Sequence, residues 1–263
     1  MKHSPKCSRV GAAGFALFAA FLLFICVDTA NGQKRRPVVN KNPTRIVAAK
    51  RAAAPAIAVV IDERLSVLRF EPSLTAIPLQ RMSAGRTMQI TGSRQTDDGL
   101  TFYRVQLPPE KSGWVLAEAV VRTDRRDEDA RLLRLIRVSD GFEQIERAVI
   151  FLENFPNSTF RPAVLLMLGD SVENVSQRLS RDATRRFDED EMRANAAPIQ
   201  SFYLNYNGLD RYRRLGIGFV FNRKSKQFHY DGAGWREIVQ KHKQSYESAE
   251  AQKRLDALAE KMK

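Results

Sequence analysis

The sequence predicts an α+β protein with more than one domain: a small β-barrel or sandwich, followed by a mainly helical domain with an inserted β-hairpin. Three observations lead to this prediction. Short strand-like runs extend as far as Val121, helical periodicity replaces them after Arg122, and a strand–turn–strand pattern interrupts the helices near 217–230. We therefore expect a β domain at 57–122 and a helical domain at 127–263.

Five short stretches in the first of these regions have the composition of strands. Breaker residues separate them, and Asp98-Gly99 just before the aromatic pair Phe102-Tyr103 is a hairpin signal. Several short strands without helical periodicity are typical of a small barrel or sandwich. The predicted strands are 57–61, 65–70, 87–91, 101–107 and 113–116.

Beyond Arg122, apolar residues recur at spacings of three and four, which predicts amphipathic helices that pack on one another. Pro162 lies where a helix tolerates proline, in its first turn. A charge-rich stretch at 181–195 predicts a further helix. The helical faces are predicted by Leu132, Leu135 and Ile136; by Ile145, Ala148, Val149 and Leu152; by Leu165, Leu168, Val172, Val175 and Leu179; and by Ile199, Phe202, Tyr203 and Tyr206, with a stop at Asn207-Gly208.

Apolar residues at 217–221 and 227–230 flank a polar turn, which predicts the β-hairpin. Helical periodicity then returns twice before the end of the chain. The two predicted faces are Trp235, Ile238, Val239 and His242, and Ala251, Leu255, Leu258 and Met262.

The N-terminus has the pattern of a signal peptide at 1–32. An uncharged run of 18 residues follows a basic segment, and Ala30-Asn31-Gly32 places small residues where a signal peptidase cleaves, before Gln33. The alternative is an uncleaved membrane anchor at 10–27, because such a run can just span a bilayer. Both interpretations predict an exported protein.

Residues 33–56 have the composition of a disordered linker. They contain seven basic side chains and no acidic one, together with three prolines. One interpretation is a solvated spacer, and the other is electrostatic attachment to an anionic membrane surface.

The net charge indicates which binding partners suit the protein, and the positions of the cysteines exclude several kinds of site. The formal net charge is +13, and both cysteines, Cys7 and Cys26, lie within the predicted signal peptide. The mature chain would therefore have no disulfide, thiolate nucleophile or cysteine-based metal site. Export argues against nucleic acid as the partner of this basic protein and favours lipid head groups, acidic glycans or peptidoglycan carboxylates.

The β region carries a series of short motifs that resembles the bacterial SH3-like domain family. The resemblance implies an SH3-like β-barrel, and its most specific part is the closing Gly-Trp-Val. The chain departs from the family at Ser66-Val67-Leu68, where the family usually has Leu-Asn-Val. The motifs are Arg69-x-x-Pro72-Ser73, Gly85, Ile90-Thr91-Gly92, Tyr103-Arg104-Val105, Gly113-Trp114-Val115 and Ala119-Val120-Val121.

Domains of this family commonly attach envelope proteins and wall-cleaving enzymes to peptidoglycan, or dock proteins. By resemblance, Arg69, Tyr103 and Trp114 are expected near a ligand-binding groove. Aromatic rings with a polar tip suit stacking on a glycan or peptide. The alternative, which we favour for Tyr103 and Trp114, is that the rings fill the core of a small barrel.

The helical region is similar to the tetratricopeptide-like (TPR-like) family of envelope proteins. The residues that carry the resemblance are Ala148-x-x-Phe151-Leu152-x-x-Phe155-Pro156-x-Ser158, followed by Ala163 and Leu168-Gly169-Asp170. A fainter copy begins at Ile238-Val239 with lysine in place of the proline. The resemblance implies stacked helix pairs that bind peptides or proteins.

A basic and aromatic cluster at 202–214 precedes the predicted hairpin. It offers Tyr206, Arg211 and Tyr212 as candidates for a docking surface. The alternative, which we favour, is structural, because its aromatic residues already share a helical face with Ile199.

Catalytic motifs are sparse. His229 and His242 are the histidines beyond the predicted signal peptide, and their spacing does not match a His-Glu-x-x-His zinc site. A Gly-x-Ser-x-Gly elbow and a phosphate-binding loop are also missing from the sequence. We therefore expect no catalytic residues, cofactor or metal; a glycosidase with an unrecognised carboxylate pair remains the alternative, because such a pair needs no fixed spacing.

Together, two modules of binding type favour an exported, non-enzymatic binding or adaptor protein of the bacterial cell envelope or periplasm. Its expected partners are peptidoglycan or envelope proteins.

Overall fold

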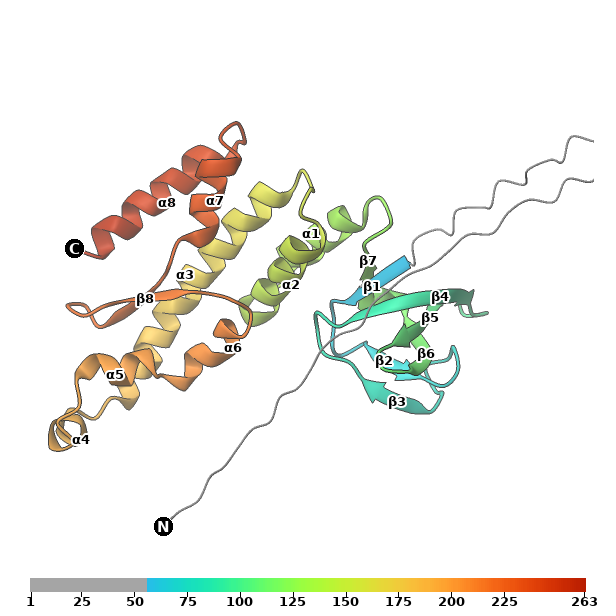
Figure 1. Ribbon diagram of the computed structural model, residues 1–263, viewed down its shortest axis with the longest axis horizontal. Coiled ribbons are helices and arrows are strands. Elements are labelled where there is room, and N and C mark those ends of the chain that lie inside the picture. The colour runs from blue at the N-terminus through green and yellow to red at the C-terminus, as the bar shows by residue number, and fades with distance from the viewer. Residues whose placement is uncertain (1–55) are drawn as a thin grey trace, which may run out of the picture. The chain divides into compact units, whose positions relative to one another are not determined.

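The computed structural model describes residues 56–263 (Figure 1). The predicted signal peptide, the alternative anchor at 10–27 and the predicted linker up to residue 55 lie outside the described residues. Among the helices at 56–263, none combines the length and the apolar character that crossing a membrane requires.

The first described region is a seven-stranded antiparallel sheet with the strand order β3-β2-β6-β5-β4-β1-β7. β3 and β7 are edge strands that each pair with a single neighbour, so the described pairing does not close the sheet into the expected barrel. The strands are β1 (Ala56–Val60), β2 (Val67–Arg69), β3 (Pro78–Arg81), β4 (Thr87–Gln95), β5 (Thr101–Leu107), β6 (Lys111–Leu116) and β7 (Val120–Arg122), with the short 3-10 helix η1 (Ala117–Ala119) before the last.

The five predicted strands are present, and β5 has the predicted bounds. The predicted hairpin at Asp98-Gly99 joins β4 to β5, and Gly99 takes a φ of +81°, a conformation that favours glycine. β3 and β7 were not predicted. β3 begins with Pro78 and is largely exposed, so it lacks the apolar alternation that identifies a strand.

The chain becomes helical from Glu128 onward, as predicted. Pro162 lies in the first turn of α3 as expected. α3 extends into the charge-rich stretch as far as Arg186, and the further helix predicted there is present as the short α4. The helices are α1 (Glu128–Val138), α2 (Gly141–Asn154), α3 (Arg161–Arg186), α4 (Glu189–Ala194), α5 (Ile199–Leu204), α6 (Asp210–Arg213), α7 (Ala233–Lys241) and α8 (Glu247–Lys261), with the 3-10 helix η2 (Asn207–Leu209) before α6.

The predicted hairpin between helices is formed by β8 (Phe219–Asn222) and β9 (Gln227–Tyr230). β9 packs on α3, where the backbone N–H of Phe228 donates a hydrogen bond of 2.8 Å to Ser180 Oγ. α7 packs between α3 and α8. The hairpin therefore covers α3 instead of standing apart from the helices.

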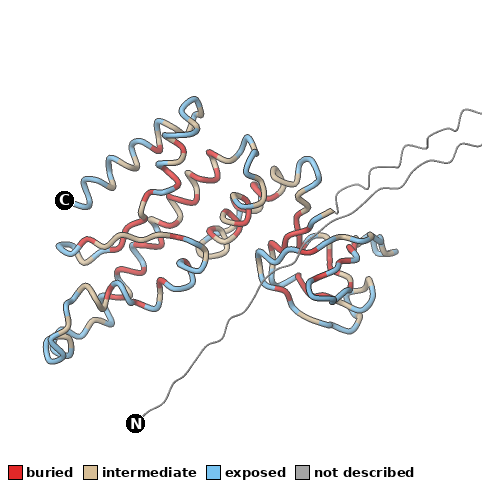
Figure 2. Tube along the Cα trace, in the orientation of Figure 1, coloured by how far each residue is buried: buried red, intermediate tan, exposed pale blue. Residues whose placement is uncertain are grey.

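Buried residues occur in both the sheet region and the helical region (Figure 2). Their side chains form two clusters. One is the core of the sheet region and includes Leu68, Phe102 and Val115. The other fills the helical region, but it also includes Val59, Ile61 and Val121 from the sheet region. Because both regions bury residues in the same cluster, the described residues belong to one compact unit.

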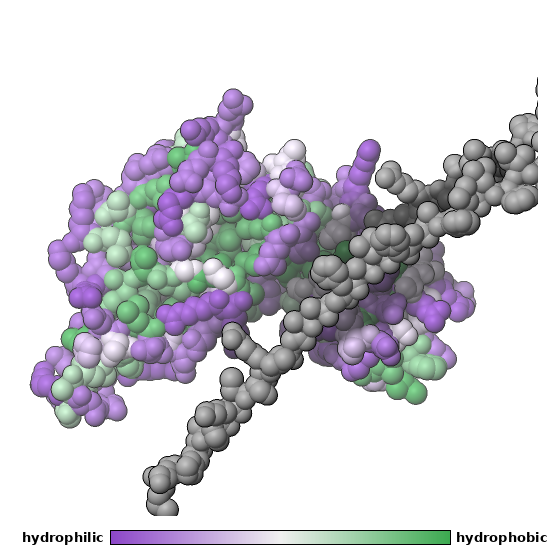
Figure 3. All heavy atoms as spheres, in the orientation of Figure 1, coloured by the Kyte–Doolittle hydropathy of each residue, from purple (hydrophilic) through white to green (hydrophobic). Residues whose placement is uncertain are grey.

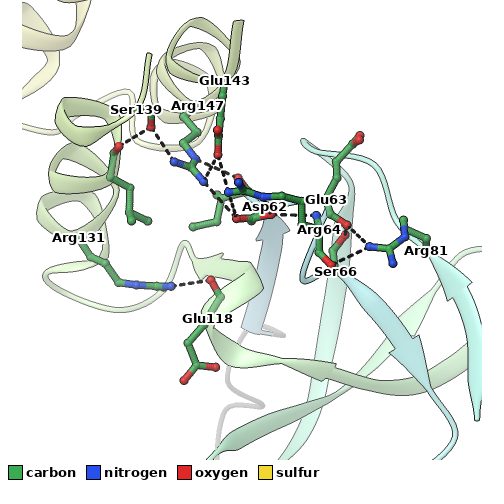
Figure 4. Close-up of polar contacts among 12 residues, drawn as sticks. Asp62, Glu63, Arg64, Ser66, Arg81, Glu118, Arg131, Ser139, Glu143 and Arg147 are labelled. Atoms are coloured by element: carbon green, nitrogen blue, oxygen red, sulfur yellow. Dashed lines mark hydrogen bonds and ion pairs between the residues drawn. The ribbon is translucent and has the colours of Figure 1, made fainter. Parts of the chain in front are cut away.

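Polar contacts reinforce this junction (Figure 4). The guanidinium of Arg147 on α2 is buried and donates hydrogen bonds to the Ile61 carbonyl (3.2 Å), Asp62 Oδ2 (3.3 Å) and Ser139 Oγ (2.6 Å). Glu143 lies 2.5 Å from the same guanidinium. Arg147 thus connects β1 and the residues after it to both α1 and α2.

Candidate ligand-binding site

A surface groove beside Trp114 has a volume of about 530 Å³. It lies between the connection from β2 to β3 and the β4–β5 hairpin. Its lining combines the half-buried indole with cationic, acidic, hydroxyl and amide side chains. The lining residues are Glu71, Pro72, Ser73, Arg94, Gln95, Thr96, Asp97 and Trp114. We call this the Trp114 groove.

Strand register decides which predicted residues can reach this groove. Trp114 on β6 lies opposite Arg69 on β2 and Arg104 on β5, so these three residues share one face of the sheet. Tyr103 precedes Arg104 and pairs with Val115, which places it on the opposite face. Its ring is 6% exposed and lies 5.6 Å from the Arg122 guanidinium. Tyr103 is therefore a core residue that does not line the groove.

Arg69 acts on the groove through the loop beside it. Its Nη1 donates a hydrogen bond of 2.9 Å to the carbonyl of Ala76. The bond crosses the connection that carries Glu71, Pro72 and Ser73, three lining residues. Arg69 therefore supports one wall of the Trp114 groove.

Gly113 explains why the Gly-Trp-Val motif suits this position. A Cβ at Gly113 would lie 2.8 Å from the Arg69 carbonyl oxygen and 2.8 Å from Leu68 Cγ, closer than real atoms approach. Glycine lets β6 approach β2 at the point where Trp114 meets Arg69. The motif is thus required by strand packing beside the groove.

An exposed apolar patch continues from the same wall. Phe70, Leu74 and Ile77 on the β2–β3 connection are 65%, 50% and 70% exposed, and the Phe70 N–H donates to the Ile77 carbonyl at 3.1 Å. Figure 3 shows hydrophobic surface at this end of the sheet region. An indole, an apolar patch and mixed charges together suit an amphipathic ligand such as a glycan or peptide.

The second predicted cluster is mostly structural. Tyr206 and Tyr212 are 8% and 1% exposed and belong to the helical core. Arg211 is exposed, donates a hydrogen bond of 2.7 Å to the Tyr212 hydroxyl and lies 4.9 Å from the Phe142 ring. Of the three residues, Arg211 alone presents its polar group at the surface.

Sequence analysis missed a polar group around Glu173 on α3. Its Oε1 lies 2.9 Å from His229 Nδ1 on β9 and accepts a hydrogen bond of 2.7 Å from Lys261 Nζ on α8, while its Oε2 accepts from the Tyr230 N–H at 2.9 Å. Burial alone would raise the pKa of this carboxyl, but these hydrogen bonds outweigh burial and hold the pKa below its usual value. The three side chains are far apart in the sequence, and no local motif signals their meeting. Within 56–263, no group of three or more His, Cys, Asp or Glu residues has the geometry of a metal site.

Comparison of the chain with protein-family models, curated proteins and solved structures finds no match. The SH3-like and tetratricopeptide-like resemblances therefore rest on the residues quoted above. A function has to be argued from the geometry of the Trp114 groove and the surfaces around it.

Proposed function

We propose that this chain is an exported, non-enzymatic adaptor of a bacterial cell envelope. In this proposal, the sheet region is an SH3-like domain that binds peptidoglycan in the Trp114 groove. The helical region is a tetratricopeptide-like domain that presents a second surface to an envelope protein. Residues 1–32 direct export, and the basic linker strengthens attachment to anionic membrane surface.

The Trp114 groove is the observation that carries the proposal. Peptidoglycan combines apolar sugar faces with hydroxyl, amide and carboxylate groups. The indole of Trp114 offers a stacking face, Arg94 offers a cation for a carboxylate, and Ser73, Gln95 and Thr96 offer hydrogen-bonding groups. The groove therefore matches each chemical feature of such a ligand.

The shared core supports an adaptor role. Val59, Ile61 and Val121 pack into the helical cluster, and Arg147 adds hydrogen bonds across the same junction. Because the sheet region and the helical region share one core, binding surfaces on the two regions cannot move independently. A ligand bound to the sheet region is therefore held at a fixed distance from a protein bound to the helical region.

The test is cosedimentation of the chain from Gln33 onward with purified cell-wall sacculi. Point variants are preferable to deletion of 57–121, because the deletion would remove three residues of the helical core. Trp114→Ala and Arg94→Glu should each reduce the pelleted fraction severalfold. Tyr246→Ala, which removes an aromatic ring that is 96% exposed elsewhere, should leave it unchanged.

Arg94 is exposed, so Arg94→Glu does not disturb the core. A loss of binding in this variant therefore reports on the groove and not on unfolding. Circular dichroism checks that Trp114→Ala, whose indole packs partly against the sheet core, still folds. Equal pelleting of all variants would refute peptidoglycan binding in the Trp114 groove. If Trp114→Ala and Arg94→Glu bind sacculi normally but no longer bind an envelope protein, the groove is a protein-docking site.

A wall-active glycosidase is the second candidate, because Glu71 and Asp97 place two carboxyl groups in the same groove as Trp114. Sustained release of soluble sugar fragments from sacculi, abolished in Glu71→Gln or Asp97→Asn, would support it. Binding without release would leave the adaptor proposal in place.

A further inference from the structure

A second groove, of about 1000 Å³, lies between α3, the β8–β9 hairpin and the end of α8. We call it the basic groove. It shares no lining residue with the Trp114 groove. The residues that line it are Gln177, Arg178, Ser180, Arg181, Asp182, Thr184, Arg185, Ser225, Lys226, Gln227, His229 and Lys261.

Positive charge dominates the basic groove. Five of its described lining residues are cationic, and one, Asp182, is acidic. Arg178, Arg181 and Arg185 lie three and four residues apart, so they follow one face of α3 over about 10 Å. Lys226 adds a cation from the hairpin. Like charges at this spacing repel one another, and that repulsion is relieved by a bound anion.

Few of these charges are neutralised by the chain itself. Asp182 pairs with Arg185, and Glu173 pairs with Lys261 at 2.7 Å. Within 56–263, neither Arg178, Arg181 nor Lys226 forms an ion pair. Lys226 Nζ lies 5.3 Å from the centre of the Phe187 ring, a contact that leaves its charge unneutralised. Three cations around one groove therefore carry no neutralising partner among the described residues.

His229 adds a polar group to the floor of the basic groove. Its side chain is 3% exposed, and its Nδ1 contacts Glu173, which fixes the orientation of the ring. Nε2 has no hydrogen-bond partner among the described residues. Glu173 is not among the lining residues, and its carboxylate is engaged by His229, Lys261 and the Tyr230 N–H.

The walls of the groove are fixed to one another. Ser180 Oγ accepts from the Phe228 N–H at 2.8 Å, which joins α3 to the hairpin. Asn222 Nδ2 donates to the Lys261 carbonyl at 2.6 Å, which joins the hairpin to α8. Cations held on connected walls are preorganised, and preorganisation reduces the entropic cost of binding.

We propose that the basic groove binds a ligand that carries two or more closely spaced phosphate groups. Guanidinium groups bind phosphate oxygens through paired hydrogen bonds, and phosphate carries more charge per group than carboxylate. The excess of cations over acids in the lining matches two phosphate groups better than two carboxylates. Such groups occur in phosphate-bearing polymers and in lipid head groups, and both present the same chemistry to the arginines.

The experiment is calorimetric titration of the chain from Gln33 onward with inorganic tripolyphosphate at physiological salt. The double variant Arg181→Gln/Lys226→Gln should bind at least about tenfold more weakly. A matched control, Arg137→Gln/Lys243→Gln, removes the same charge from exposed positions that lie outside the groove and its hairpin wall. The affinity of the control for tripolyphosphate should stay within about twofold of that of the unmodified chain, since the basic linker contributes equally to all variants.

Equal weakening in both double variants would show unspecific charge attraction and overturn the proposal. So would citrate binding as tightly as tripolyphosphate. Vesicles with and without cardiolipin, whose head group carries two phosphates, distinguish a lipid head group from a soluble phosphate polymer. Trp114→Ala should bind tripolyphosphate as the unmodified chain does, so failure of the Trp114 groove and failure of the basic groove remain distinguishable.

Discussion

Arg147 is a buried cation whose partners come from three parts of the chain. Its guanidinium contacts the carbonyl of Ile61, the carboxylate of Asp62 and the hydroxyl of Ser139. Hydrogen bonds from Arg64 hold the pKa of Asp62 below its usual value, so this partner stays ionised near neutral pH. Removing the guanidinium would leave the Ile61 carbonyl without this donor, and the largely exposed Arg64 would remain as the cation paired with Asp62.

Arg147→Ala should lower the free energy of unfolding by about 3 kcal/mol, because it breaks a buried, hydrogen-bonded charge pair. Urea denaturation followed by circular dichroism measures the change. Arg137→Ala, which removes an exposed arginine from the neighbouring helix α1, should cost less than about 0.5 kcal/mol. Similar losses in the two variants would contradict the role assigned to Arg147.

Glu173 makes stability depend on pH. Because its pKa in the folded chain is lowered from 4.5, its contribution is present at neutral pH and is lost as pH falls below that value. Glu173→Gln should therefore destabilise by about 1–2 kcal/mol at pH 7, and the difference from the unmodified chain should shrink in acid.

The measurement is urea denaturation of both proteins at neutral pH and below pH 4. Glu153→Gln, at an exposed position of α2, is the control and should show little difference at either pH. If the loss of unfolding free energy in Glu173→Gln persists or grows in acid, the pKa of Glu173 is not lowered by folding as described.

At the scale of elements, the periodicity of apolar residues correctly predicted those helices and strands whose position depends on burying one face. β5 and β9 have the predicted bounds because their apolar and aromatic residues form dense local signals. β3 was missed because its position depends on pairing with β2. The predicted face from Ile199 to Tyr206 is shorter than expected: α5 ends at Leu204, and Asn207-Gly208 lies in a 3-10 turn.

The candidate site could be predicted only in part for a similar reason. The local motif Gly113-Trp114-Val115 placed Trp114 near an expected groove by resemblance, but we favoured a core role for its ring, which is half-buried and lines the groove. The separation of Tyr103 from Trp114 depends on strand register, which a motif does not contain. The basic groove joins α3, the hairpin and α8, and their meeting is a result of tertiary packing.

α3 and α7 meet where Gly169 faces the indole of Trp235. A Cβ at Gly169 would overlap the indole Nε1 and Cε2 atoms, and Trp235 is 2% exposed. Gly169→Ala should therefore destabilise by about 1–3 kcal/mol, although alanine favours the helical conformation.

Thermal denaturation of Gly169→Ala measures this effect. Gly92→Ala is the matched control, since a Cβ there would meet Arg104 Cβ at an ordinary 3.8 Å. A Gly169→Ala protein as stable as the unmodified chain would show that Trp235 does not pack against α3 as described.

At the scale of the whole molecule, one cluster of buried residues connects the sheet to the helices. Val59, Ile61 and Val121 are each at most 2% exposed, and burying such side chains contributes roughly 2 kcal/mol apiece. The sheet region and the helical region should therefore unfold in a single cooperative transition.

The two tryptophans of the chain allow a direct measurement of this cooperativity, because Trp114 reports on the sheet and Trp235 on the helices. Urea denaturation of Trp114→Phe and Trp235→Phe, followed by fluorescence, is compared in each variant with circular dichroism. The fluorescence and circular dichroism midpoints should coincide within each variant. Two separated transitions would mean that the regions fold independently.

The measurement that tests the proposed function most directly is fluorescence titration of the chain with soluble peptidoglycan fragments. Trp235 is buried, so a change on ligand addition reports on Trp114. We expect a saturable blue shift that Trp114→Phe abolishes and Tyr246→Ala preserves. No saturable change, or the same change in Trp114→Phe, would contradict peptidoglycan binding in the Trp114 groove.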